Sequence, residues 1–128
     1  DNNLNSPNTI ANLVGNNWSV VSLEGASLLK DTSIDFSISN EGMVKGNAGV
    51  NNYFGQWLID ANNVVPEKIA STKMYRSDPK GIMQQEYHYL TLLSSVTKWQ
   101  LVAEELQFYE DEKLIVTLHN NGEIKSVK

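Results

Sequence analysis

The chain has 128 residues, of which 41% are hydrophobic, enough to build one core in a single domain. It carries 10 basic and 15 acidic residues, and this acidic balance argues against unaided binding to nucleic acid or to an anionic membrane surface. The sequence contains no cysteine, which excludes thiol catalysis, zinc-thiolate sites and iron–sulfur clusters. No stretch approaches the roughly 18 apolar residues that span a bilayer.

The first twelve residues differ in composition from the rest of the chain. Residues 1–12 are polar, rich in Asn and contain Pro7, so we expect a flexible leader. Residues 13–128 then predict one domain. Because the sequence begins at Asp1, any signal peptide or lipid-anchored cysteine would lie upstream, on a precursor.

The first part of the domain has the pattern of β-strands. Residues 18–23 change phase midway, which indicates a bulge or burial on both faces. Residues 33–39 alternate strictly, with Ile34, Phe36 and Ile38 on one face, and predict a half-buried strand. A tight turn over residues 40–42 follows.

The centre of the chain is a strand interrupted by glycines. Gly46 and Gly49 lie within the segment GNAGVNNYFGQW at 46–57 and indicate a bend or a close approach of two backbones. After a turn at residues 62–63, a further strand contains Pro66, which places it at an edge or bends it.

One helix is predicted. Asp78 is suited to its N-cap and Pro79 to its first position, so we expect a helix from about residue 79 to residue 95. Residues that recur at spacings of three and four form a stripe along one side of the helix, and we expect this stripe to pack on the sheet. This stripe consists of Met83, Tyr87, Leu90 and Ser94, flanked by Ile82, Tyr89 and Leu93.

Three strand candidates end the chain, at 97–103, 106–109 and 113–119, and they predict an antiparallel meander. Strands, one helix and further strands together indicate an α+β fold that is mainly β. The expected architecture is a small antiparallel barrel or half-barrel of about eight strands with one packed helix.

The residues specify no reaction. The two histidines, His88 and His119, lack the spacing of a metal site. The carboxylates at 104–105 and 110–112 belong to consecutive turns, which lie at opposite ends of a meander, so they do not predict a calcium site. We found no nucleophile elbow or phosphate-binding loop and therefore predict no catalytic, metal or cofactor-binding residue.

Several blocks in register resemble the META domain, the HslJ-like family of heat-shock lipoproteins. They are LVGNNW at 13–18, VSLEG at 21–25, the segment 46–57, IASTKM at 69–74 and the helical pattern at 83–96. The resemblance implies a small antiparallel barrel with one packed helix. It also implies a bacterial cell-envelope setting, as a periplasmic protein or an outer-membrane or cell-surface lipoprotein linked to stress response, without an agreed molecular activity.

The chain departs from this family at two positions. Many members carry cysteines where this sequence has Val50 and Tyr75. If those cysteines are bridged in the relatives, we expect packing to join the two segments here instead.

We therefore predict a monomeric, non-enzymatic envelope module that contacts an unknown protein partner. The candidate interaction surface consists of Asn51, Asn52, Tyr53, Thr72 and Tyr75. The Asn and Thr side chains could instead satisfy buried backbone groups at the bend. An alternative function is transport of a small apolar ligand inside the barrel, which requires a cavity lined by Phe36, Phe54, Tyr87 and Trp99.

Overall fold

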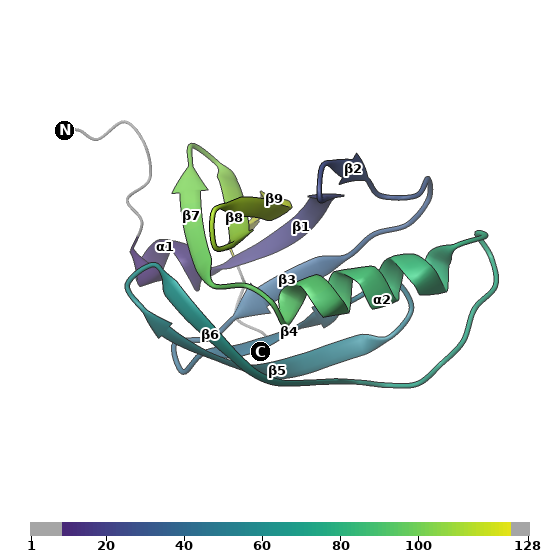
Figure 1. Cartoon of the computed structure of the whole chain (residues 1–128), viewed down its shortest axis with the longest axis horizontal. Helices are drawn as coiled ribbons and strands as arrows, with labels where there is room; N and C mark the ends of the chain where they lie inside the picture. The colour runs from purple at the N-terminus through teal and green to yellow at the C-terminus, as the bar shows by residue number, and fades with distance from the viewer. Residues whose placement is uncertain (1–8, 124–128) are drawn as a thin grey trace.

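The computed structural model describes residues 9–123 and contains one sheet and two helices (Figure 1). In chain order the elements are α1 (Ile10–Leu13), β1 (Asn16–Leu23), β2 (Ala26–Ser27), β3 (Asp35–Ile38), β4 (Met43–Asn47), β5 (Asn52–Asp60), β6 (Asn63–Ser71), α2 (Ile82–Leu93), β7 (Lys98–Val102), β8 (Glu105–Glu110) and β9 (Lys113–Glu123).

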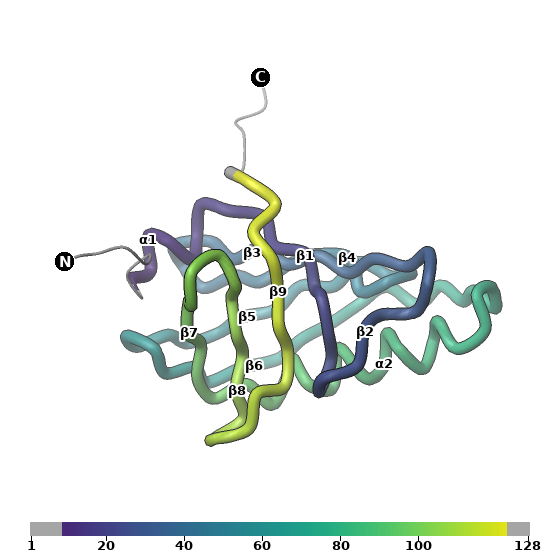
Figure 2. The backbone as a smooth tube through the Cα atoms, turned by 90° about the horizontal axis from the view of Figure 1, so that it is seen from above, coloured from purple at the N-terminus to yellow at the C-terminus, as the bar shows by residue number. Residues whose placement is uncertain are grey.

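The sheet is antiparallel and closes on itself. Its strand order is β2-β1-β3-β4-β5-β6-β7-β8-β9, and β1 also pairs with β9 along most of its length. In Figure 2 the β7–β9 meander runs across the direction of β3–β6, so the two halves face each other around the interior. The predicted antiparallel barrel with one packed helix is confirmed.

The ring has one weak junction, between β6 and β7. β6 pairs with β5 from Asn63 to Ser71, but among the described residues it pairs with β7 only at Asn63 and Lys98. α2 follows β6 in the chain and leads into β7, and it lies beside this junction (Figure 1). One side of the barrel is therefore completed by a helix instead of a strand pair.

Aromatic rings fill the interior. Trp18, Trp57 and Trp99 are each at most 1% exposed. The ring of Phe36 lies 5.3 Å from that of Trp57 and 5.1 Å from that of Phe108, in tilted and edge-to-face arrangements. These are the preferred geometries of packed aromatic side chains.

The strand predictions agree with the structure in most places. β1 has register shifts on either side of Trp18–Val20, which confirms the predicted bulge, and Val21 is exposed. Ile34, Phe36 and Ile38 are buried as expected. β6 has a register shift beside Pro66, and the three last strands form the predicted meander.

The predicted start and face of the helix were wrong. α2 begins at Ile82, after Gly81, whose φ of 91° is left-handed, and not at Pro79. Its buried residues are Ile82, Glu86, Tyr89, Leu92 and Leu93. Tyr87 is 74% exposed, so the buried face consists of the three residues that the prediction placed at the flank together with Glu86 and Leu92.

The last residues of the predicted leader lie in the first described element. Residues 10–12 belong to α1, and Leu13 at its end is buried. The indole Nε1 of Trp18 donates a hydrogen bond to the carbonyl oxygen of Leu13 at 3.1 Å, which ties α1 to the core. The remainder of the predicted leader, residues 1–8, lies outside the described residues.

Gly46 is a position where two backbones approach too closely for a side chain. A Cβ added to it would meet the carbonyl oxygen of Asp35 and would lie 2.8 Å from the Tyr53 hydroxyl. We expect Gly46→Ala to lower the free energy of unfolding by about 2 kcal/mol, the cost of overpacking. Gly15→Ala is the matched control, because its added Cβ would lie 3.7 Å from its nearest neighbour. Urea denaturation measures both, and equal stabilities would contradict the prediction.

Candidate functional site

Glu86 is a carboxylate on the buried face of α2. It follows Ile82 by four residues and precedes Tyr89 by three, so all three side chains point into the protein. Glu86 is only 4% exposed. A buried carboxylate is costly unless it accepts hydrogen bonds, so its surroundings have to supply donors.

Those donors come from the loop between β4 and β5. Glu86 Oε1 accepts hydrogen bonds from the backbone N–H groups of Val50 at 2.8 Å and Asn51 at 2.7 Å. Its Oε2 accepts one from Asn51 Nδ2, also at 2.7 Å. Three N–H groups thus face one carboxylate, and hydrogen bonds to a charged acceptor are among the stronger ones in proteins.

Asn51 extends the contact to a third segment. Its Nδ2 also donates to the carbonyl oxygen of Met74 at 2.9 Å, and its Oδ1 accepts from the Met74 N–H at 2.6 Å and the Thr72 hydroxyl at 2.8 Å. The side-chain amide therefore uses both of its hydrogens and both lone pairs. We call this set the Glu86–Asn51 network; it joins α2, the loop at 48–51 and the segment at 72–74.

Two buried tyrosines meet next to this network: Tyr89, one turn after Glu86 on α2, and Tyr53 of β5. Tyr53 Oη donates to the carbonyl oxygen of Asp35 at 2.8 Å, so Tyr89 Oη donates to Tyr53 Oη at 2.6 Å. Both rings are at most 1% exposed. Burial raises the pKa of the Tyr53 hydroxyl well above its usual value, and burial likewise raises the pKa of Tyr89.

The other side of α2 is held at the surface by a hydrogen bond between His88 and Glu24. Glu24 contacts His88 Nε2 at 2.7 Å and Lys113 Nζ at 2.5 Å. Hydrogen bonds from Lys113 and then His88 lower the pKa of the Glu24 carboxyl. His88 thus has a structural partner, and between residues 9 and 123 no group of His, Asp and Glu side chains could hold a metal ion.

The structure separates the candidate interaction surface into two parts. Asn51 and Tyr53 are 2% and 1% exposed, and they serve the interior as described above. Asn52, Thr72 and Tyr75 lie at the surface. The alternative that polar side chains satisfy backbone at the bend therefore applies to Asn51, whose partners include both backbone groups of Met74.

Large apolar side chains surround the exposed part. Met74 is 58% exposed, Tyr75 79% and Tyr87 74%. Sequence reasoning missed Met74 and assigned Tyr87 to the buried stripe of the helix. It also gave Glu86 no structural role, although a lone carboxylate among apolar helix positions is a signal that could have found it.

Two adjoining hollows, of about 280 and 450 Å³, lie between α2 and the end of β6. Both are lined by Ser71, Lys73, Tyr87 and Leu90, so they form one continuous surface feature, which we call the α2–β6 groove. Met74 lines the first hollow, and Ile69, Thr91, Ser94 and Ser95 line the second. The groove therefore begins directly outside the Glu86–Asn51 network.

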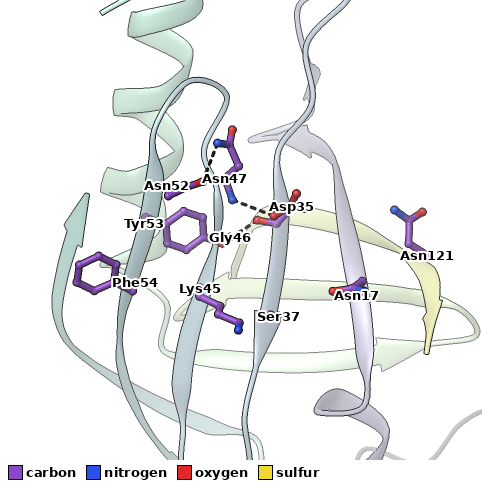
Figure 3. Close-up of a pocket in the computed structure, with 10 residues that line it drawn as sticks. All are labelled: Asn17, Asp35, Ser37, Lys45, Gly46, Asn47, Asn52, Tyr53, Phe54 and Asn121. Carbon is purple, nitrogen blue, oxygen red and sulfur yellow. Dashed lines mark hydrogen bonds between the residues drawn. The ribbon is translucent and has the colours of Figure 1, made fainter. Parts of the chain in front are cut away.

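A larger hollow of about 710 Å³ lies on the outer face of β1, β3, β4 and β5 (Figure 3). Several of its polar groups bind each other: Asp35 Oδ1 accepts from the Asn47 N–H at 2.8 Å, and Asn47 Nδ2 donates to Asn52 Oδ1 at 3.0 Å. These bonds fix the bend after β4. Its single carboxylate, that of Asp35, is engaged with backbone.

Comparisons with known proteins agree with this architecture. A family model described as the META domain matches residues 11–122. No curated protein matches. An NMR structure of a protein from Burkholderia xenovorans is similar at a TM-score of 0.68 and 18% identity, covering 94% of this chain and 95% of the other. A second NMR structure gives a TM-score of 0.66 at 15% identity, covering 85% and 92%. At these identities the two structures show the fold alone.

No helix among residues 9–123 has the length and apolar character needed to cross a membrane.

The network predicts a specific sensitivity of Glu86 to amide substitution. Glu86→Gln keeps the shape of the side chain but turns an N–H₂ group towards Asn51 Nδ2 or towards the two backbone N–H groups. We expect the free energy of unfolding to fall by about 2 kcal/mol, because a buried donor loses its acceptor. Glu112→Gln, in an exposed turn, is the control and should stay within about 0.5 kcal/mol of the parent. Equal urea midpoints for the two variants would show that the network does not support the fold.

The buried tyrosines predict a loss of stability at alkaline pH. An unfolded tyrosine ionises near pH 10, whereas burial raises the pKa of Tyr53 and Tyr89 in the folded protein. The stability that this difference contributes is complete below about pH 10 and is lost as the pH rises above it. In urea titrations between about pH 9 and 11.5, Tyr89→Phe should lose stability less steeply than the parent. Parallel pH profiles would contradict the prediction.

Proposed function

The chain belongs to the META domain family, and from this premise we propose that it is a non-enzymatic protein-interaction module of the bacterial cell envelope. In this proposal the protein is exported, works as a monomer in the periplasm or as a lipoprotein at the outer membrane or cell surface, and contributes to stress tolerance. Support for the cell-envelope setting comes from the resemblance to the HslJ-like lipoproteins, which implies it.

The observation that carries the proposal is an apolar surface on a fixed framework. Met74, Tyr75 and Tyr87 expose more than half of their side chains. Exposed aromatic and Met side chains that are held in place supply contact area at low cost in conformational entropy, and they are enriched in protein interfaces.

The framework under this surface is rigid for a physical reason. Met74 is bound through both of its backbone groups by Asn51, and Asn51 is in turn bound to Glu86 on the helix that carries Tyr87. Any movement of the segment at 72–75 relative to α2 would leave buried polar groups without partners. The segment at 72–75 and α2, which carry the apolar side chains, therefore keep a fixed position relative to each other.

The interior argues against the alternative of a ligand carrier. Of the four residues expected to line an internal cavity, Phe36 and Trp99 are packed in the core, while Phe54 is 52% and Tyr87 74% exposed. Phe36 contacts both Trp57 and Phe108, so the space between the strands is occupied by side chains. These observations favour contacts at the surface over a ligand inside the barrel.

Site-specific photo-crosslinking in cells that express the protein tests the proposal. A benzophenone amino acid placed at Tyr75 or at Tyr87 should give the same discrete protein adduct, because both positions face one partner. Leu58 is the matched control, since it is 50% exposed and lies on β5, away from the α2–β6 groove. Adducts from all three positions, or from none, would overturn the assignment of this surface.

A further inference from the structure

The edge of β6 that faces α2 carries an unused strand-pairing surface. β6 pairs with β5 along its whole length, while among residues 9–123 its other edge pairs only at Asn63, with Lys98 of β7. The end of the strand, near Ser71, instead borders the α2–β6 groove. Unpaired strand edges are templates on which another extended segment can add.

The hydrogen-bonding direction along this edge follows from the pairing with β5. The Thr72 N–H donates to the carbonyl oxygen of Asn52 at 3.0 Å, and Phe54 lies opposite Ala70. Because the direction alternates along an antiparallel strand, Thr72 and Ala70 face β5. The N–H and C=O groups of Ile69 and Ser71 therefore point towards the groove.

The groove offers suitable walls for a short strand. Its apolar part is formed by Ile69 and Leu90, and its far side carries the hydroxyl groups of Thr91, Ser94 and Ser95. An added strand would lie between a sheet edge and a helix, with alternate side chains directed to the apolar part and to solvent.

The usable edge is short. Pro66 has no N–H, and the register shift between Gly55 and Trp57 leaves one more residue on β6 than on β5 at Glu67 and Lys68. A proline and a bulge are devices that prevent extended edge-to-edge pairing. They disfavour a second copy of β6 as the occupant and leave room for a segment of a few residues.

Charge selects the chemistry of that segment. Residues 67–80 contain four basic residues, Lys68, Lys73, Arg76 and Lys80, and two acidic ones, Glu67 and Asp78, for a net +2. Of these, Lys73 lines both hollows of the groove, while the Glu86 carboxylate that lines the first is occupied by its three N–H donors. The whole chain has a net charge of −5, so the rest of it carries −7. A second copy would place this basic segment against itself, whereas an acidic segment is attracted to it.

We infer that the α2–β6 groove binds a short, extended, acidic segment of another protein, which adds as a strand to the edge of β6 at Ile69–Ser71. This inference rests on the proposed interaction function and specifies its mode.

The test uses the peptide acetyl-Glu-Val-Glu-Val-Glu-Val-amide as the probe, followed by amide hydrogen exchange and chemical shifts in NMR. Binding should slow exchange at Ile69 and Ser71 by at least about tenfold. A peptide with Lys in place of Glu should bind at least about tenfold more weakly, and so should one N-methylated at alternate residues, because it cannot form the ladder. No protection at Ile69 and Ser71, equal binding of the N-methylated peptide, or protection of both amides already in the free protein would overturn the inference.

Two variants separate the mode of binding from folding. Ser71→Pro removes an N–H that points towards the groove, and Lys73→Glu reverses a charge that lines it. Each substitution should therefore lower the affinity for the acidic peptide by about tenfold or more. Lys45→Glu, on the outer face of β4, is the charge control and should bind the peptide as the parent does. Unchanged affinity in both groove variants would overturn the inference. If crosslinks from Tyr75 and Tyr87 persist in Ser71→Pro, strand addition fails while the proposed function stands.

Discussion

The arrangement of this fold depends on one buried carboxylate. Glu86 is 4% exposed, and burying its charge is tolerable only because three N–H groups of Val50 and Asn51 face it. Those donors are available only when the loop after β4 turns its backbone towards α2. The helix therefore cannot settle on the sheet by apolar contact alone, since a shift by one residue would leave the carboxylate and its donors unpaired. The network supplies the specificity that apolar packing lacks.

The need for this specificity follows from the sheet. A closed barrel fixes all of its strands through hydrogen-bonded neighbours, but here β6 meets β7 at a single pair, and α2 completes that side. A helix has no backbone groups to offer a strand edge, so side chains have to make the connection. Glu86 and Asn51 do this for the end of β6 and the segment after it, while Glu24 holds His88 on the opposite side of the helix. As a consequence, the edge of β6 and the α2–β6 groove beside it remain open to solvent.

The parts that could be predicted from the sequence are those that a local pattern determines. The strict alternation over 33–39 identified a strand because its apolar residues, at every second position, are the ones that lie buried. The face of α2 was misassigned because the charged Glu86 occupies a buried position and interrupts the apolar stripe on the buried face. The neighbouring face, which contains Tyr87, therefore looked like the more apolar one. The helix start was misplaced because Pro79 has the typical features of a first helical residue, whereas Gly81 is the N-cap and the helix begins at Ile82. The bonds from Asn51 to Thr72 and Met74 connect segments more than 20 residues apart, and no local pattern contains them.

The join between the loop at 48–51 and the segment at 72–75 also shows how this chain does without a covalent link. The resemblance to the META and HslJ-like proteins implies that many members carry cysteines at the positions of Val50 and Tyr75, and packing was expected to join the two segments here instead. In the structure Val50 is buried while Tyr75 is 79% exposed. Asn51 holds the segment through the backbone of Met74 instead. A disulfide would hold position 75 by its side chain. A backbone join leaves the side chains of Met74 and Tyr75 at the surface, so the bonds that hold this segment also position the apolar surface beside the groove.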